Sequence, residues 1–261
     1  MNASWDPGRY LVFAGERGRP FVDLVARIDA SDPRVVVDLG CGPGNLTSLL
    51  ADRWPGAAVT GVDASADMVR AASDTIPAER VVFHRADLRD WLREAPLGSV
   101  DVLVSNATLQ WLPEHLDLLP ALVDALAPGG WLAFQVPGNH DEPSHTIRAE
   151  LAAREPYAAH TATAAHVGAH DAATYLRALQ RLGCTVDAWE TTYLHVLQGP
   201  DPVFTWVSGT GARPTLQALP AGLRPRFEEE FKARLREAYP DEGYGVVLPF
   251  RRIFVVARRP G

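Results

Sequence analysis

Strands and helices alternate through the first half of this chain, and that alternation limits its fold more than any other feature. Residues 35–39 form an apolar run broken only by Asp38 and ended by glycine. A run of this length suits a parallel strand that is covered on both faces. A helix is expected over residues 45–54, because Pro55 and Gly56 follow it. Residues 16–28 have the pattern of an amphipathic helix.

The same strand-then-helix unit recurs along the chain. We expect further strands at residues 58–62, 81–84, 100–105 and 131–136, and helices at residues 66–75, 87–93 and 113–126. Five such units imply a parallel sheet with right-handed crossovers.

The pattern changes after Pro137. Residues 137–170 are rich in Ala, His and Pro, and residues 199–243 are polar and helical in pattern. A helix at 171–182 and strands at 185–194 and 246–257 complete the chain. We therefore expect an α/β fold: one domain over 1–261 with a doubly wound, mostly parallel seven-stranded sheet. The insertions, at about 137–170 and 199–243, would form a helical cap over the carboxyl edge, where open α/β sheets bind ligands. The alternative is a solvated helical decoration.

Composition narrows the classes of partner. The 261 residues carry a net charge of −7, which repels phosphate backbones and disfavours nucleic acid. The two cysteines are too few for a disulfide framework. Residues 1–10 have no signal-peptide pattern, and no apolar run approaches the roughly 18 residues of a membrane span. We expect a cytoplasmic protein with a small-molecule partner, and an anionic substrate would need locally placed cations.

A glycine loop follows the first strand. In the segment Asp38-Leu-Gly40-Cys-Gly42-Pro-Gly44, Gly40 and Gly42 allow a tight turn and close approach to a ligand. Amides at the next helix start can receive an anionic group. The spacing is G-x-G-x-G, not the dinucleotide pattern G-x-G-x-x-G. With the preceding acid, it resembles the first motif of class I S-adenosylmethionine methyltransferases, which have a Rossmann-like fold. The alternative is a bare turn.

Asp63 ends the second expected strand, 19 residues beyond Gly44. A carboxylate at that distance can accept both hydrogens of a ribose diol. Its alternative role is an N-cap for the next helix, which Ser65 could fill instead. Ala64, between them, is a further candidate for cofactor contact.

Two later strand ends carry the remaining cofactor candidates. Asp87 is placed to accept from an adenine amine, and the Leu88 amide could donate to a ring nitrogen; helix capping is the alternative for Asp87. Asn106 ends the fourth strand, where the backbone would line the methionine half of the cofactor. These positions follow one another at the carboxyl ends of strands one to four.

The whole chain also resembles the trans-aconitate 2-methyltransferase family. The likeness includes the N-terminal segment from Trp5 to Pro20, the segment from Asn106 to His115, Thr210 to Pro214, and Pro249 to Phe254. The segments 160–170 and 228–236 do not match it well. The resemblance implies S-adenosylmethionine as cofactor and monomethyl esterification of a tricarboxylate. A carboxylate is already ionised at pH 7, so we expect no general base; positioning and desolvation carry the catalysis.

A polycarboxylate substrate needs cations, and guanidinium groups bind carboxylates bidentately. Arg213 is the first candidate, Arg252 and Arg19 are weaker ones, and surface salt bridges are their alternative. An aromatic, hydrogen-bonding wall could be formed by Trp111, His115, Tyr193 and Tyr244, and by Tyr10, which is also a candidate for cofactor contact. Core or rim positions are the alternative for each of them.

Other classes of function stay open at this point. His160, His166 and His170 invite a metal site, but no Cys or well-spaced carboxylate completes the set, so we expect no metal. A methyltransferase acting on a malonyl-carrier-protein thioester is the main alternative; it would want a basic docking face. A non-catalytic cofactor-binding module and a nicotinamide oxidoreductase are less favoured.

Overall fold

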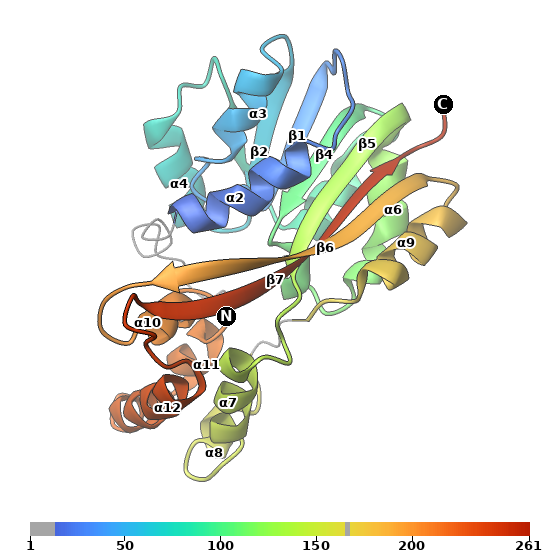
Figure 1. Cartoon of the computed structure of the whole chain (residues 1–261). Helices are drawn as coiled ribbons and strands as arrows, with labels where there is room; N and C mark the ends of the chain where they lie inside the picture. The colour runs from blue at the N-terminus through green and yellow to red at the C-terminus, as the bar shows by residue number, and fades with distance from the viewer. Residues whose placement is uncertain (1–13, 165–167) are drawn as a thin grey trace.

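The computed structural model describes residues 14–164 and 168–261. Its strands are β1 (Val35–Leu39), β2 (Ala58–Asp63), β3 (Val82–Arg85), β4 (Val100–Asn106), β5 (Leu126–Pro137), β6 (Thr185–Leu197) and β7 (Val246–Arg258). They form one seven-stranded sheet in the order β3-β2-β1-β4-β5-β7-β6 (Figure 1). The pairs among β1 to β5 are parallel, whereas β7 is antiparallel to both β5 and β6. The expected mostly parallel sheet is confirmed.

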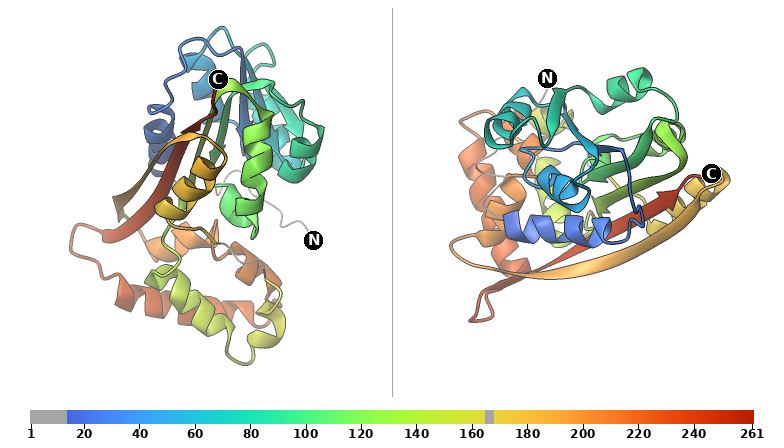
Figure 2. Two further views of the ribbon diagram at one scale, coloured as in Figure 1. Left: turned by 90° about the vertical axis from the view of Figure 1, so that its right-hand side faces the viewer. Right: turned by 90° about the horizontal axis from the view of Figure 1, so that it is seen from above.

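Helices cover both faces of the sheet (Figure 2). The helices of the described chain, some of which lie outside these two layers, are α2 (Ala14–Val25), α3 (Thr47–Arg53), α4 (Ala66–Thr75), α5 (Leu88–Glu94), α6 (Leu119–Ala125), α7 (Pro143–Ala152), α8 (Ala158–Thr161), α9 (Ala172–Arg181), α10 (Pro202–Ser208), α11 (Arg213–Ala218) and α12 (Arg224–Ala238). Neighbouring strand residues serve opposite faces, as the two-residue strand period requires. Val36 packs in the cluster that contains α2 and α3 side chains, and Val37 packs in the cluster that contains those of α5, α6 and α9.

The helix expected at residues 113–126 is shorter than predicted. Two 3-10 turns, η1 (Leu109–Trp111) and η2 (His115–Leu118), precede α6, which begins only at Leu119. Proline lacks an N–H and its ring clashes with the preceding turn, so it is favoured in the first turn of a helix and is unfavourable farther along, although α2 does contain Pro20 in its interior. Pro120 occupies that first turn and therefore fixes where the helix starts.

The last two strands extend past the rest of the sheet. β6 ends at Leu197, three residues beyond the expected Leu194, and β7 pairs with β5 only from Arg252 onward. Residues 246–251 of β7 pair with β6 alone. This two-stranded ribbon leads to helices α10, α11 and α12.

Five helices, which we call the cap helices, lie beyond the end of β5: α7, α8, α10, α11 and α12 (Figure 1). They share a hydrophobic cluster with the ribbon, in which Trp206, Phe227 and Phe231 are fully buried. The cap helices are therefore packed elements with a core of their own. No helix in the described part of the chain combines the length and apolar character needed to cross a membrane.

We expect Phe227→Ala to lower the free energy of unfolding by about 3–5 kcal/mol, because it leaves a cavity beside Tyr157, whose ring meets Phe227 edge-on at 5.0 Å. Chemical denaturation measures this change. Leu97→Ala is the control: Leu97 is 79% exposed, so its loss should stay within about 0.5 kcal/mol. A Phe227→Ala loss as small as the control's would show that the cap cluster adds little to stability.

Candidate functional site

The glycine loop turns sharply between β1 and α3 and packs against the chain that follows β4. The Gly40 and Cys41 amides donate to Val62 O at 2.7 and 3.1 Å. Gly40 has a φ of +81°, and a Cβ there would lie 2.0 Å from Thr108 Oγ1, so no other residue fits. Beside Gly42, with a φ of +56°, no atom of the residues that the structure describes lies within 4 Å of an added Cβ. The backbone at Gly42 is thus open to close approach by a ligand.

Asp38 lies beneath this loop. Its Oδ2 accepts from Thr47 Oγ1 at 2.6 Å, whereas its other oxygen, Oδ1, is buried without a hydrogen-bond partner in the described part of the chain. Asn45 Oδ1, at the far end of the loop, is also buried and unpartnered. Burial, and less strongly the charge of Asp63, raises the pKa of Asp38 to about 7. The loop therefore presents two unsatisfied acceptors, which suits a ligand with a cationic N–H group.

Asp63 joins the loop to the end of β2. Its Oδ2 accepts from the Gly42 amide at 2.9 Å and its Oδ1 accepts from the Ser65 amide at 2.8 Å. Burial raises its pKa, and these hydrogen bonds oppose the shift. Ser65, not Asp63, is the N-cap of α4, so the alternative role of Asp63 is filled by Ser65. Ala64 between them is exposed. Each Asp63 oxygen keeps a second lone pair for a ligand.

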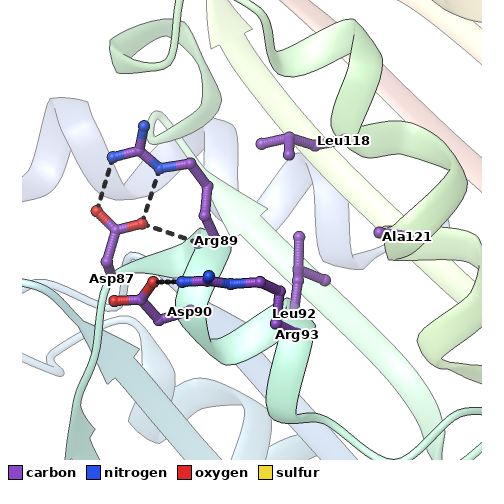
Figure 3. Close-up of a pocket in the computed structure, with 7 residues that line it drawn as sticks. All are labelled: Asp87, Arg89, Asp90, Leu92, Arg93, Leu118 and Ala121. Atoms are coloured by element: carbon purple, nitrogen blue, oxygen red, sulfur yellow. Dashed lines mark hydrogen bonds and ion pairs between the residues drawn. The ribbon is translucent and has the colours of Figure 1, made fainter.

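Asp87 takes the capping role that the sequence left as its alternative. It is the N-cap of α5, and both of its oxygens also accept from the Arg89 guanidinium, at 2.9 and 3.0 Å (Figure 3). This pairing lowers the pKa of Asp87. Leu88 is the first residue of α5, so its amide has no acceptor within the helix. Asp87 and Arg89 line a pocket of about 570 Å³ between α5 and the start of α6.

Two side-chain hydrogen bonds connect the ends of β4, β5 and β7. Gln135 Nε2 donates to Asn106 Oδ1 at 2.6 Å, and Arg252 Nη1 donates to Gln135 Oε1 at 3.4 Å. Ala107, next to Asn106, has a φ of +53°, an uncommon conformation for a residue other than glycine. Gln135 is not among the residues predicted from the sequence, although it is the only polar side chain in the apolar run 131–136.

Four of the substrate candidates form two pairs. The Arg213 guanidinium lies 5.7 Å from the centre of the Trp111 ring, and burial lowers the pKa of Arg213 to about 10. The Arg19 guanidinium lies 5.1 Å from the centre of the Tyr193 ring. Tyr193 is buried, and its hydroxyl donates to Asp23 at 2.6 Å. Tyr193 is thus held within the α2–β6 packing.

The structure does not bring His115 or Tyr244 into the site. His115 is 1% exposed, and its ring nitrogens lie 2.8 Å from Leu112 O and 2.6 Å from the Tyr175 hydroxyl, which leaves no ring nitrogen for a substrate. Tyr244 is 59% exposed, and its hydroxyl bonds Glu242. The candidate Tyr10 lies outside the described residues.

The metal alternative gains no support from the described residues. Among them, no group of three or more His, Cys, Asp or Glu side chains could hold an ion. His166 lies outside the described part of the chain. His170 instead contacts the His115 ring, with ring centres 5.3 Å apart.

Comparisons with known proteins agree on the family. Residues 13–188 match the model of a methyltransferase domain. The trans-aconitate 2-methyltransferase of Streptomyces avermitilis is 52% identical over 98% of this chain and 97% of that protein. The protein of the same name from Rhodococcus jostii is 49% identical over 97% of this chain and 99% of that protein.

A solved structure shares the fold at low sequence identity. The phosphoethanolamine N-methyltransferase 2 of Haemonchus contortus, in complex with S-adenosylhomocysteine, matches with a TM-score of 0.59 at 15% identity. The match covers 93% of this chain and about half, 53%, of that longer protein. The fold, the glycine loop and the near full-length identity to curated relatives lead to one conclusion: the chain belongs to the trans-aconitate 2-methyltransferase family of methyltransferase-domain proteins.

Proposed function

We propose that this protein is an S-adenosylmethionine-dependent carboxyl O-methyltransferase that forms a monomethyl ester on trans-aconitate or a related tricarboxylate. The observation that carries the proposal is the near full-length identity, 52% and 49%, to two proteins named for that activity. The family membership accounts for the whole chain, cap helices included. We treat residues 1–261 as one methyltransferase domain whose insertions 137–170 and 199–243 form the cap, and its cytoplasmic location stays a prediction.

The residues present fit S-adenosylmethionine. The free Asp38 and Asn45 acceptors suit its cationic amino-acid end, and the open space at Gly42 admits a ligand against the backbone. Asp63 would accept from the ribose hydroxyls, and Asp87 with the Leu88 amide would contact the adenine. Asn106 and the loop at Gly40 would line the methionine portion. When bound, this cofactor supplies an electrophilic methyl group on a sulfonium.

The protein has to bind a substrate that is an anion at neutral pH. Carboxylates with a pKa near 4 are ionised at pH 7, so no base has to remove a proton. Arg213 beside Trp111 and Arg252 beside Gln135 provide guanidinium groups near the sheet edge. The cap helices would exclude water from this edge, which strengthens each electrostatic contact.

A methyl-acceptor assay tests the proposal. Purified protein is incubated with labelled S-adenosylmethionine and, separately, trans-aconitate, cis-aconitate, isocitrate or a malonyl thioester, and products are identified by mass and ester position. We expect trans-aconitate to have the highest kcat/KM and to give a monomethyl ester. Preference for the thioester would contradict the substrate assignment, and cofactor binding without turnover of any acid would favour a binding module.

The Asp63 assignment predicts that Asp63→Asn weakens cofactor affinity by about 10-fold to 100-fold, because a charged acceptor is lost from the site. Calorimetric titration with S-adenosylmethionine measures the effect. The control is Asp67→Asn, on the exposed side of α4, where the carboxylate pairs only with Arg70 at the surface; its affinity should stay within about twofold of wild type. Equal affinities for both variants would remove Asp63 from the cofactor site.

The raised pKa of Asp38 predicts a pH dependence of cofactor binding. A cationic ligand favours the ionised carboxylate, and the ligand-free protein takes up a proton at Asp38 as pH falls through about 7. The affinity for S-adenosylmethionine should therefore fall as the pH drops from 7.5 to 5.5, and the loss should approach about tenfold for each pH unit. Asp38→Asn should show a flatter profile.

Stability gives an independent check of the same group. The pKa of Asp38 in the folded protein lies above its ordinary value of 3.8. The protonated carboxyl therefore contributes favourably to the free energy of unfolding below pH 3.8, and this contribution is lost as the pH rises through about 7. Asp38→Asn should thus gain stability relative to wild type between pH 5 and pH 8. A difference that does not change with pH would show that Asp38 is ionised throughout that range.

A further inference from the structure

A group of polar residues outside the assignments above lies where β5 leaves the sheet. Asn139 and His140 follow β5 directly, and Ser144, His145 and Arg148 lie on α7. The group lies next to the edge of the sheet that carries Arg252, because Pro137 at the end of β5 pairs with Arg252 of β7. Two residues before Pro137 is Gln135, which bonds Asn106.

The α7 members of this group face the start of α11. Arg148 Nη1 donates to Thr215 Oγ1 at 2.8 Å, and a Cβ added to Gly211 would lie 2.8 Å from the His145 ring. His145 and Arg148 are three residues apart and so share a helix face. The His140 ring meets the His145 ring nearly edge-on, with centres 5.2 Å apart. The group therefore occupies the junction between β5, α7 and α11 (Figure 1).

Several polar atoms here are buried without a hydrogen-bond partner among the residues that the structure describes. Asn139 is 1% exposed, yet neither its Oδ1 nor its Nδ2 has a hydrogen-bond partner. The same holds for Ser144 Oγ, His140 Nε2 and Arg148 Nε. Burying a polar group without a hydrogen bond is costly, and nearly all such groups in proteins are paired. Four neighbouring residues with unpaired atoms point to a polar ligand.

Arg148 identifies the charge of that ligand. Four arginines of α12 pair with carboxylates: Arg224, Arg226, Arg234 and Arg236. By contrast, Arg148 forms no ion pair with any residue that the structure describes, and burial lowers its pKa. A half-buried guanidinium without a counter-ion is unfavourable unless an anion joins it. Its planar fork matches a carboxylate.

The two histidines do not supply the positive charge. Burial is the main cause that lowers the pKa of His145, to about 3, and the charges of His140 and Arg148 lower it further. The pKa of His140 is lowered by burial, with Arg148 and Arg251 adding to the shift and Asp141 opposing it. Both rings are therefore neutral at pH 7 and offer hydrogen bonds only.

We propose that Arg148 and Asn139, with His140 and His145 beside them, bind a carboxylate of the substrate other than the one that is methylated. The inference rests on the proposed function: once one carboxylate of a tricarboxylate faces the methyl donor, two others need partners. Arg148 pairs with the carboxylate through its fork, and Asn139 Nδ2 donates to it. This subsite would make the enzyme select acids by the number and spacing of their carboxylates.

Arg148→Met tests the subsite, because methionine keeps an apolar stem of similar length and buried charges are often replaced by apolar groups without loss of stability. We expect the KM for trans-aconitate to rise by about 10-fold to 100-fold, with the S-adenosylmethionine dissociation constant and the melting temperature nearly unchanged. Arg226→Met on α12 is the matched control, since Arg226 is exposed and pairs only with Glu230. An unchanged KM in Arg148→Met would overturn the inference and leave the proposed function standing.

Three diacids locate the carboxylate that Arg148 holds. Itaconate, glutaconate and methylfumarate each lack a different carboxylate of trans-aconitate. Arg148→Met should weaken binding of trans-aconitate strongly, and should leave unaffected the binding of the diacid that lacks the carboxylate bound by Arg148. An equal loss for all four acids would contradict a subsite for a distant carboxylate.

Asn139→Asp provides a second variant of almost the same size. It places a negative charge where the substrate carboxylate is expected, so the KM for trans-aconitate should rise at least as much as in Asn139→Ala. Binding is also measured without turnover, as the rise in melting temperature that trans-aconitate causes in the presence of S-adenosylhomocysteine. If wild type does not methylate trans-aconitate but is stabilised by it, and Arg148→Met is not, the proposed function fails and the subsite stands. A lower KM in Asn139→Asp than in Asn139→Ala would overturn the subsite.

Discussion

The carboxylate of Asp63 fixes the geometry on which the site depends. One oxygen holds the Gly42 amide at 2.9 Å, and the other holds the Ser65 amide at 2.8 Å. These bonds join the loop after β1 to the turn after β2, so both strand ends are set relative to each other before any ligand arrives. Burial disfavours the ionised form of this carboxyl and so raises its pKa. In the proposed function, a cationic ligand beside the loop would offset this unfavourable burial.

The close contact between Gly40 and Thr108 extends this constraint to β4. Only glycine allows the loop to lie against the threonine side chain with a φ of +81°. Ala107, the residue before Thr108, adopts a φ of +53°, which places the chain after β4 in an uncommon conformation. Sparsely populated backbone conformations persist where the surroundings hold them, and here Gln110 Nε2 donates to Ala107 O while the Ala107 amide donates to Gln135 O at 2.9 Å. The ends of β1, β4 and β5 thus form one connected unit.

The sequence predicted what depends on local pattern. The strand-and-helix alternation, the glycine loop and the position of Asp63 at a strand end all follow from a few neighbouring residues, and each was located correctly. The role of Asp87 was left open because a capping carboxylate and a ligand-binding one occupy the same position in sequence. The role of His115 was left open between substrate contact and a core position, because its partner, Tyr175, is 60 residues away in α9. Pairings between distant elements cannot be deduced from spacing.

The same limit explains why the residues around Arg148 escaped prediction. In sequence, a single arginine in a helix is typical of a solvated position, and the α12 arginines Arg224 and Arg226 are indeed paired with carboxylates of the same helix. What distinguishes Arg148 is its burial against Thr215 of α11 without an acidic partner, and this depends on how the cap helices pack. Buried polar groups therefore carry information that sequence pattern does not.

The charges at this edge of the sheet are divided by location. Three acids, Asp38, Asp63 and Asp87, come from the ends of the first three strands or the turns after them. The guanidinium groups of Arg148, Arg213 and Arg252 come from the cap helices and β7. If these two groups face one site, as we propose, their opposite charges favour a cationic methyl donor on the first side and a polyanionic acceptor on the second. A chain of net charge −7 repels a free polycarboxylate at long range, so in this proposal the three guanidinium groups supply the local attraction for such an acceptor.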